Sequence, residues 1–196
     1  MARPAPVLDR RLVLPALFPS PDEILFVSGL AGPARDAAEL CDDGDNLFTM
    51  AGTMGAAVPM GLGIALGAPD RRVVVITGDG ELLMKIGSLA TVATMAPGNL
   101  AIVCLDNGCH GETGGQTGHT AHRTDLAKMA EGAGLPSVMV LEAEDQMAAA
   151  KAFLEEAPGP RFLHVRVTDG PPHPYKRNFD LAYCRTKFRD AYLGSR

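Results

Sequence analysis

The stretch that decides the fold runs from residue 72 to residue 80 and reads RVVVITGDG. Its first part is a run of β-branched residues without polar alternation, which is typical of a parallel strand covered on both faces. The run stops at Gly78-Asp79-Gly80, and apolar residues at helical spacing follow from Glu81. Residues 100–108, LAIVCLDNG, show the same order of apolar strand and polar loop. The two segments predict parallel strands whose ends meet at one edge of a sheet.

Further strands and helices alternate on both sides of this centre. We expect strands over 23–28, 47–50, 137–141 and 161–168, and helices over 58–66, 81–96, 125–133 and 143–156. This alternation predicts an α/β fold with an open, doubly wound, mostly parallel sheet and right-handed crossovers. Proline spacing predicts a poorly packed N-terminal arm over 1–22, followed by one domain over 23–169. Residues 170–196 form a tail that we expect to pack on the domain or on a partner.

Composition excludes several classes of protein. The chain has 18 basic and 23 acidic residues, a net charge of −5 and no long Lys/Arg run, so we expect neither nucleic acid nor a membrane surface as a partner. No window approaches a membrane span, and prolines interrupt the apolar residues of a possible signal peptide. Four cysteines at irregular spacing argue against a disulfide framework and favour a reducing, cytoplasmic setting.

The Gly78-Asp79-Gly80 loop combines two opposing chemical features. Free backbone N–H groups at a helix start attract phosphate, whereas the Asp79 carboxylate repels it unless a cation lies between them. Mg²⁺ is commonly held by one or two protein oxygens together with phosphate oxygens. The loop therefore predicts a metal–diphosphate site, with a second ligand from Asp106-Asn107 at the end of the next strand. The alternative is a tight turn in which Asp79 only caps the helix.

Three motifs in order resemble the diphosphate-binding domain of thiamine diphosphate enzymes. They are Gly52-Thr53-Met54-Gly55, then Gly78-Asp79-Gly80, then Asn107 one strand–helix–strand pass later. Residues 105–116, LDNGCHGETGGQ, narrow the resemblance to the β, or diphosphate-binding, half of sulfopyruvate and phosphonopyruvate decarboxylases. The resemblance implies the thiamine diphosphate-binding fold, with thiamine diphosphate and Mg²⁺ as cofactors. It also implies decarboxylation of an anionic 3-substituted pyruvate to the aldehyde and CO₂.

The same resemblance implies roles for individual residues. Asp79, Asn107 and the backbone carbonyl of Cys109 would ligate Mg²⁺, and the amides of Gly80 and Glu81 would meet the diphosphate. Met54 would be the wedge that bends the cofactor, and the carbonyl of Gly52 would hold its aminopyrimidine. The expected cofactor-binding set is completed by Thr53, Gly78 and Gly111.

A resemblance to this family also implies a partner. In the family, a glutamate from a separate pyrimidine-binding domain activates the aminopyrimidine, and this chain has room for one α/β domain. We therefore expect a pyrimidine-binding α subunit in a hetero-oligomer such as α2β2. Position 112 departs from the family pattern, in which Ser or Asp is usual. A Glu112 carboxylate facing the substrate would repel a phosphonate or sulfonate. The departure therefore bears on the identity of the substrate more than on the type of reaction.

The long loop over 109–123 contains the candidate catalytic residues. His110 and Gln116 are suited to hydrogen bonds with the substrate, and an imidazole that titrates near neutral pH can donate a proton. Hydrogen bonds that only stabilise the loop are the alternative. Among the cations, Arg123 is the first candidate for the anionic head of the substrate and Lys85 the second.

Other interpretations remain open at this stage. A zinc cluster would draw on Cys104, Cys109, His110, His119 and His122, although Cys104 lies within a strand and is expected to be core. His164 is expected to be structural, and Met84, Met95 and Met129 to be core. Rival functions are a carboligating thiamine diphosphate enzyme of the acetolactate or transketolase type, a 2-oxoacid:ferredoxin oxidoreductase β chain, and a non-catalytic phosphate-binding regulator.

Overall fold

The computed structural model describes residues 6–50, 52–175 and 178–193. The helices are α1 (Arg10–Leu17), α2 (Ala31–Leu40), α3 (Ala57–Gly67), α4 (Asp79–Met84), α5 (Ser88–Met95), α6 (Leu126–Gly132), α7 (Met147–Glu156) and α8 (Leu181–Leu193). The strands are β1 (Ile24–Ser28), β2 (Leu47–Thr49), β3 (Arg72–Gly78), β4 (Leu100–Asp106), β5 (Cys109–His110), β6 (Gln116–Thr117), β7 (Ser137–Leu141) and β8 (Arg161–Arg166). Within these described ranges, no helix has the length and apolar character needed to cross a membrane.

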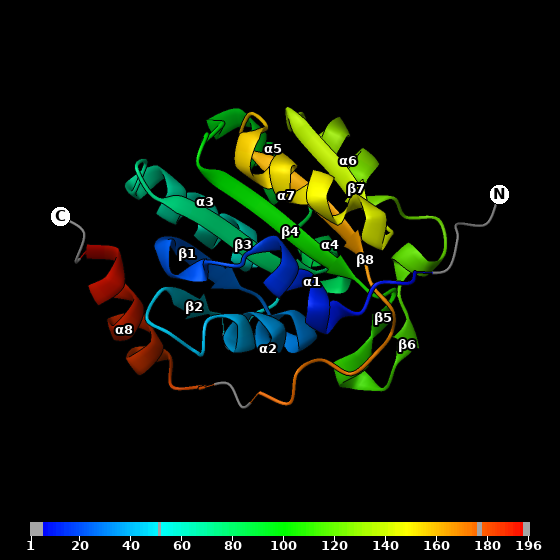
Figure 1. Ribbon diagram of the computed structural model, residues 1–196, viewed down its shortest axis with the longest axis horizontal. Coiled ribbons are helices and arrows are strands. Elements are labelled where there is room, and N and C mark those ends of the chain that lie inside the picture. Colours follow the sequence, from blue (N-terminus) through cyan, green and yellow to red (C-terminus); the bar gives the residue numbers. More distant parts are fainter. Residues whose placement is uncertain (1–5, 51, 176–177, 194–196) are drawn as a thin grey trace.

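Six parallel strands form the main sheet in the order β2-β1-β3-β4-β8-β7, with helices on both faces (Figure 1). This confirms the predicted α/β fold with its open, parallel sheet. In the register of β3 and β4, Gly78 lies beside Leu105. The loops that begin at Asp79 and Asp106 therefore leave the sheet side by side at its carboxyl edge, as predicted.

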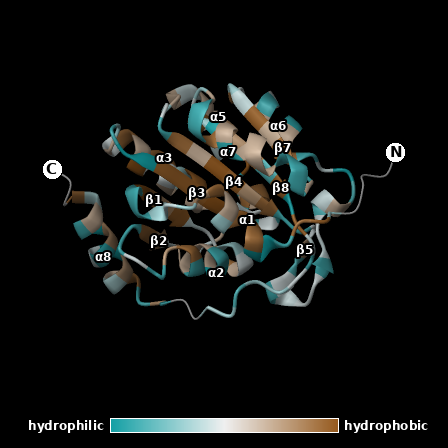
Figure 2. Cartoon of the chain, viewed as in Figure 1, coloured by the Kyte–Doolittle hydropathy of each residue, from teal (hydrophilic) through white to brown (hydrophobic). Residues whose placement is uncertain are grey.

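Successive side chains of the central strands point into two different hydrophobic cores, one on each face of the sheet. Phe26, Val74 and Val103 face the core formed with α1, α2 and α7, whereas Val75 and Ile102 face the core formed with α3, α5 and α6. Figure 2 shows the resulting concentration of hydrophobic residues in β3 and β4. Because both faces are covered, these strands read as continuous apolar runs.

The N-terminal segment is better packed than the sequence predicts. Helix α1 begins after Asp9, whose side chain accepts a hydrogen bond from the backbone N–H of Arg11. Val13 and Leu14 are 1% and 0% exposed, so the prediction of a poorly packed arm is wrong for the described part, and residues 1–5 lie outside it. Pro15 lies inside α1, which misled the prediction. Helix α2 was also not predicted, because it is short and contains Pro33 in its first turn.

The predicted helix over 81–96 is divided in two. Helix α4 ends at Met84, and α5 begins after Gly87. The prediction that three methionines are core residues is wrong, because Met84, Met95 and Met129 are 63%, 49% and 39% exposed. Apolar spacing alone does not reveal that α4, α5 and α6 leave these side chains outside the sheet contact. Cys104, by contrast, is 0% exposed and confirms the core prediction.

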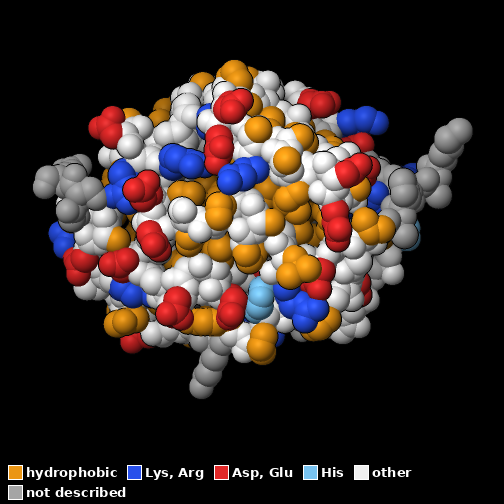
Figure 3. Space-filling view, in the orientation of Figure 1, with side chains coloured by type: hydrophobic (Ala, Val, Ile, Leu, Met, Phe, Trp, Pro, Cys, Tyr) orange, Lys and Arg blue, Asp and Glu red, His pale blue; other side chains and the backbone are white. Residues whose placement is uncertain are grey.

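The C-terminal helix α8 packs beside β2. Phe188 is buried, and its ring lies 5.6 Å from that of Phe48 in an edge-on arrangement. Phe179 and Tyr183 remain exposed. Residues 176–177 and 194–196 of the predicted tail lie outside the described residues. On the face seen in Figure 3, basic and acidic side chains are interspersed.

Candidate functional site

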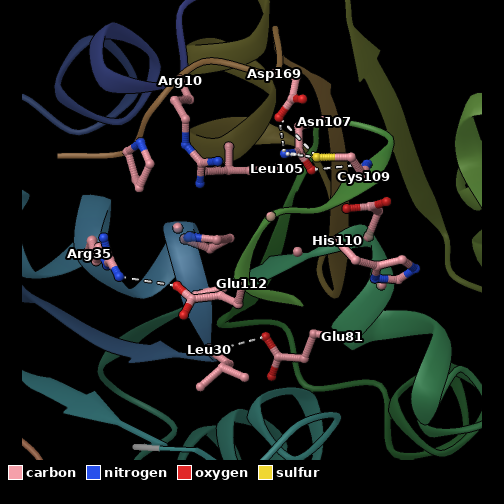
Figure 4. Close-up of a pocket in the computed structure, with 18 of the residues that line it drawn as sticks. Arg10, Leu30, Arg35, Glu81, Leu105, Asn107, Cys109, His110, Glu112 and Asp169 are labelled. Carbon is pink, nitrogen blue, oxygen red and sulfur yellow. Dashed lines mark hydrogen bonds and ion pairs between the residues drawn. The ribbon is translucent and has the colours of Figure 1, made fainter. Parts of the chain in front are cut away.

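A cavity of about 520 Å³ lies at the carboxyl edge of the sheet (Figure 4). Its walls come from the ends of β1, β3, β4 and β8, from α1 and from the start of α2. The polar residues that line it include Arg10, Arg35, Asp79, Glu81, Asn107, Cys109, His110, Glu112 and Asp169. Ligands of open α/β sheets bind at this edge because the loops that follow the strands converge there.

Asp79 is the most unusual carboxylate of the cavity. It follows β3 directly, opens α4 and is only 3% exposed. Burial, and next the charge of nearby Asp106, raise the pKa of Asp79 to about 6. A buried carboxylate beside a second carboxylate is stabilised when it takes up a proton or binds a cation.

A chain of hydrogen bonds fixes the position of Asp79. The Thr120 hydroxyl lies 3.0 Å from Oδ2 of Asp79 and 2.7 Å from Oδ1 of Asp106. The other oxygen of Asp106 lies 2.7 Å from Nε2 of the buried His164. A hydroxyl has one hydrogen and cannot donate fully to two carboxylates. Burial alone would raise the pKa of Asp106, but hydrogen bonds from His164 and Thr120 lower it. Asp106 is therefore the anion of the pair, and a proton or a cation belongs on Asp79.

Asn107 and Cys109 form a second cluster, just after the end of the neighbouring strand β4. The Nδ2 atom of Asn107 donates to Oδ1 of Asp169 at 3.2 Å, and the Cys109 thiol donates to the same oxygen at 2.9 Å. Burial, and then the hydrogen bond to Asp169, raise the pKa of Cys109 to about 11. The thiol of the metal-free chain therefore stays protonated at neutral pH. The Cys109 carbonyl and the Asn107 side-chain oxygen are the hard donors of this cluster.

Glu81 connects α4 to the loop after β1. Its Oε2 atom accepts hydrogen bonds from the Leu30 backbone N–H at 3.0 Å and from Thr77 Oγ1 at 3.1 Å. A Cβ atom on Gly29 would lie 1.6 Å from this oxygen, so glycine is required there. Burial raises the pKa of Glu81. Glu81 thus holds the β1 loop against the start of α4.

Two arginines line the cavity, neither of them among the predicted cations. Arg10, from α1, donates from Nε to Oδ2 of Asp36 at 2.7 Å, and both side chains are buried. Arg35, from α2, pairs with Glu112 at 3.3 Å (Figure 4). The predicted cations, Arg123 and Lys85, are exposed and lie outside the cavity-lining set.

Comparison with known proteins identifies the family. Residues 36–165 match the model of the C-terminal TPP-binding domain of thiamine pyrophosphate enzymes. The chain belongs to this family. As a TPP-binding domain, it shares its fold with a protein from Mycobacterium smegmatis described as a thiamin diphosphate-dependent enzyme. The TM-score is 0.65 at 24% identity, over 83% of this chain and 32% of the other.

Two kinds of relative are similar in sequence. Phosphonopyruvate decarboxylase of Streptomyces viridochromogenes is 39% identical over 169 residues, which are 86% of this chain and 41% of that protein. Sulfopyruvate decarboxylase subunit beta of Methanothermobacter thermautotrophicus is 40% identical over 149 residues, 76% of each chain. The TPP-binding domain described here thus spans about two-fifths of the phosphonopyruvate decarboxylase. These relatives carry the two activities that the sequence resemblance implies.

The structure brings together most of the predicted site residues. The cavity is lined by Met54, Gly78, Asp79, Gly80, Glu81, Asn107, Cys109, His110 and Gly111. Gly52 and Thr53 are exposed and lie outside the lining set. Gln116 is also outside, and its side chain bonds to Thr113 at 2.7 and 2.9 Å within the β5–β6 hairpin.

Sequence reasoning missed several residues of the cavity. Asp169 and Leu30 follow the ends of β8 and β1, so the rule that placed Asp79 and Asn107 at the carboxyl edge applies to them as well. This rule does not apply to Arg10, because Arg10 comes from α1 and reaches the cavity only through tertiary packing. Thr120 and His164 are likewise placed by packing.

Proposed function

We propose that this chain is the diphosphate- and Mg²⁺-binding subunit of a thiamine diphosphate-dependent 2-oxoacid decarboxylase. Its substrate would be an anionic 3-substituted pyruvate, sulfopyruvate or phosphonopyruvate, and its products the aldehyde and CO₂. The single observation that carries the proposal is the buried Asp79 carboxylate, which lines the same cavity as the oxygen donors at the end of the neighbouring strand. The four cysteines, all free, favour a reducing, cytoplasmic setting.

The residues present fit Mg²⁺. Asp79, Asn107 and the Cys109 carbonyl offer hard oxygen atoms, which Mg²⁺ prefers. The raised pKa of Asp79 reflects a buried carboxylate that lies near Asp106, and a divalent cation would relieve this repulsion. Thr120 and His164 would hold the two carboxylates apart in fixed orientations, as second-shell groups commonly do at metal sites.

The loops also fit a diphosphate. A Cβ atom on Gly80 would lie 2.7 Å from the His110 ring, so glycine at this position lets the His110 ring approach the start of α4. The backbone N–H groups at the start of α4 would bind phosphate oxygens. When bound, thiamine diphosphate supplies the carbon nucleophile and the electron sink that decarboxylation needs.

The remaining cavity residues would handle the substrate. His110 would donate a proton, being half-buried in the lining and within reach of the Gly80 backbone. The pairing of Glu112 with Arg35 offsets the carboxylate that would otherwise repel an anionic head group. Gln116 would need a movement of the hairpin to reach the cavity, because Thr113 holds its side chain.

A pyrimidine-binding α subunit would supply the activating glutamate. The naming of relatives as beta subunits supports a partner of this kind. Met54, proposed as the wedge, is 36% exposed at the cavity, and Met84 beside it is 63% exposed. A partner that covered these side chains would complete the site.

Calorimetry tests the proposal directly. Thiamine diphosphate with Mg²⁺ is titrated into the chain, alone and together with the pyrimidine-binding chain. Binding is expected to require Mg²⁺, to tighten with the partner and to be lost in Asp79→Asn. Asp70→Asn is the matched control, since Asp70 is exposed before β3 at the far edge of the sheet.

Turnover then separates the possible reactions. With the partner present, release of CO₂ and aldehyde from sulfopyruvate or phosphonopyruvate supports decarboxylation, whereas a longer 2-hydroxyketone product would support carboligation. Absence of cofactor binding under both conditions would contradict the proposal and favour a phosphate-binding regulator.

A further inference from the structure

Arg10 has a guanidinium group that its protein neighbours only partly satisfy. The side chain is 5% exposed, and Nε is bound to Asp36. The Nη2 atom is buried and has no hydrogen-bond partner among the described residues. Figure 4 shows the guanidinium pointing into the cavity. Leaving a buried charged donor without an acceptor is costly, so such a group indicates a missing anion.

The Asp36 pair accounts for only part of this charge. Oδ2 of Asp36 binds Arg10, while Oδ1 accepts hydrogen bonds from the backbone and the ring of His173 at 3.0 and 3.1 Å. Both oxygens of Asp36 are thus engaged, and neither accepts a hydrogen bond from Nη2. It ties α1, α2 and the C-terminal segment together and fixes the direction of the guanidinium.

The carboxylates of the cavity wall are engaged elsewhere. Glu112 pairs with Arg35, and Asp169 accepts from Asn107 and Cys109. Glu81 accepts two hydrogen bonds through Oε2, whereas its Oε1 is buried and has no partner, and Asp79 accepts one from a threonine. None of these oxygens accepts a hydrogen bond from Nη2, which leaves a ligand of the cavity as the acceptor that we infer.

Neighbouring contacts place Arg10 beside the proposed diphosphate site. A Cβ atom on Gly32 would lie 2.1 Å from Nη2, so the guanidinium rests on the first turn of α2. The next residue, Pro33, packs on Gly78, since a Cβ there would be 3.4 Å from its ring. Helix α2 has no side-chain cap, which leaves its first N–H groups available for an anion.

We propose that Arg10, together with the first turn of α2, binds the terminal phosphate of the cofactor diphosphate. The inference rests on the proposed function. In this arrangement Asp36 orients the guanidinium, Nη2 donates to a terminal phosphate oxygen, and Gly32 leaves room for the contact. The N-terminal helix α1 is thereby part of the cofactor site.

Titrations with three phosphate ligands test the role of Arg10. Inorganic pyrophosphate, thiamine diphosphate and thiamine monophosphate, each with Mg²⁺, are titrated calorimetrically into the full chain. Arg10→Gln is expected to weaken binding of the two diphosphates by about 10- to 100-fold, the value of a charge-assisted hydrogen bond. Binding of the monophosphate, which lacks the terminal phosphate, should change by less than about threefold. Arg11→Gln is the matched control, because Arg11 is the next residue and forms an exposed pair with Asp9.

A second variant separates ligand binding from structural support. Asp36→Asn removes the negative charge beside Arg10 but keeps a side-chain oxygen that can accept from its Nε and orient the guanidinium, so pyrophosphate affinity should be retained or increase. An equal loss in Asp36→Asn and Arg10→Gln would overturn the inference and leave Arg10 a packing residue. If Arg10→Gln does not fold, Arg10→Lys decides the matter, because it keeps a positive charge but not the planar guanidinium: its affinity for the two diphosphates should fall while its affinity for the monophosphate stays the same, and unchanged affinity for all three ligands would overturn the inference.

The remaining outcomes distinguish the two proposals. Unchanged pyrophosphate binding in Arg10→Gln, with normal binding by the unmodified chain, overturns the role of Arg10 alone and points to another anion, such as the substrate head group. Equal weakening of the monophosphate overturns the assignment to the terminal phosphate. Failure of the unmodified chain to bind pyrophosphate with Mg²⁺ contradicts both the diphosphate site and the role of Arg10.

Discussion

At the scale of single residues, the carboxylate of Asp79 has the largest influence on the electrostatics of the site. Its carboxylate is buried near a second carboxylate, and Thr120 lies between the two. Without a cation this arrangement disfavours the charged form, and with one it provides a strong ligand. The same carboxylate therefore destabilises the metal-free chain at neutral pH and would bind the metal.

This arrangement predicts a pH dependence of stability. Because the pKa of Asp79 is raised from 3.8 to about 6, the native state binds more protons than the unfolded state between these values. The free energy of unfolding contributed by Asp79 should therefore fall as the pH rises through this range and stay low above it. Asp79→Asn is expected to stabilise the metal-free chain at pH 7.5 by about 2 kcal/mol in urea unfolding. Equal stability at pH 7.5 and loss of stability at pH 4 would contradict this sign. Mg²⁺ affinity should weaken below pH 6, because protons compete for the carboxylate.

Glu112 and Arg35 provide a prediction about substrate affinity. Their pair is 3.3 Å long, and both side chains are more than one-third exposed. Glu112→Gln frees Arg35 and removes a negative charge, so KM for sulfopyruvate or phosphonopyruvate should fall by about two- to fivefold, as expected for an exposed pair. Arg35→Gln should raise KM. Steady-state kinetics with the partner present measure both, and a change in kcat alone would contradict this role.

At the scale of elements, two glycines of helix α3 are expected to respond in opposite ways to the same substitution. Gly61 and Gly63 lie two residues apart in the same helix. A Cβ on Gly61 would lie 2.2 Å from Cγ2 of Val75 in β3, whereas a Cβ on Gly63 meets nothing within 4 Å. The close approach of α3 to the sheet depends on Gly61.

Alanine substitutions test this difference. Gly61→Ala is expected to destabilise the chain by about 1–3 kcal/mol, because the added methyl forces α3 from β3. Gly63→Ala is expected to stabilise it by about 0.5–1 kcal/mol through helix propensity. Urea unfolding measures both, and equal effects would show that the packing of α3 on β3 is looser than described.

Helix α1 is the second element with a clear prediction. Leu14 is 0% exposed in the core, whereas Leu12, in the same helix, is 66% exposed. Leu14→Ala should cost about 2–5 kcal/mol, and Leu12→Ala less than about 0.5 kcal/mol. A small cost for Leu14→Ala in denaturant titrations would restore the view of a poorly packed arm.

At the scale of the whole molecule, the cavity opens beside exposed apolar side chains. Met84 follows the phosphate-binding loop, and its Cβ would lie 3.3 Å from a Cβ on Gly55 in the loop that carries the proposed wedge. Exposed apolar side chains beside the proposed cofactor site are suited to be covered by the proposed partner.

Association with the pyrimidine-binding chain tests this surface. Met84→Glu should weaken association by at least about tenfold while leaving the melting temperature of the isolated chain within about 2 °C. Met95→Glu is the control, since Met95 is also exposed but ends α5 before β4 begins, at the other edge of the sheet. Analytical ultracentrifugation measures both, and equal association of Met84→Glu and the unmodified chain would exclude this face.

The sequence by itself determined the parallel sheet and the place of its polar loops. The apolar runs of β3 and β4 and the polar residues directly after them are local signals, because strands buried on both faces and ending at one edge leave this pattern in the chain. The family motifs around Asp79 and Asn107 follow the same local order.

Tertiary structure alone decided which distant side chains complete the site. Arg10, Thr120 and His164 come from a helix, a loop and a strand far from Asp79 in sequence, and no local pattern marks them. Their roles arise from burial, which removes water and leaves protein groups as the partners of each charge. For the same reason the sequence could not distinguish Gly61 from Gly63, or an exposed Met84 from a core methionine, because the difference lies in what packs against each residue.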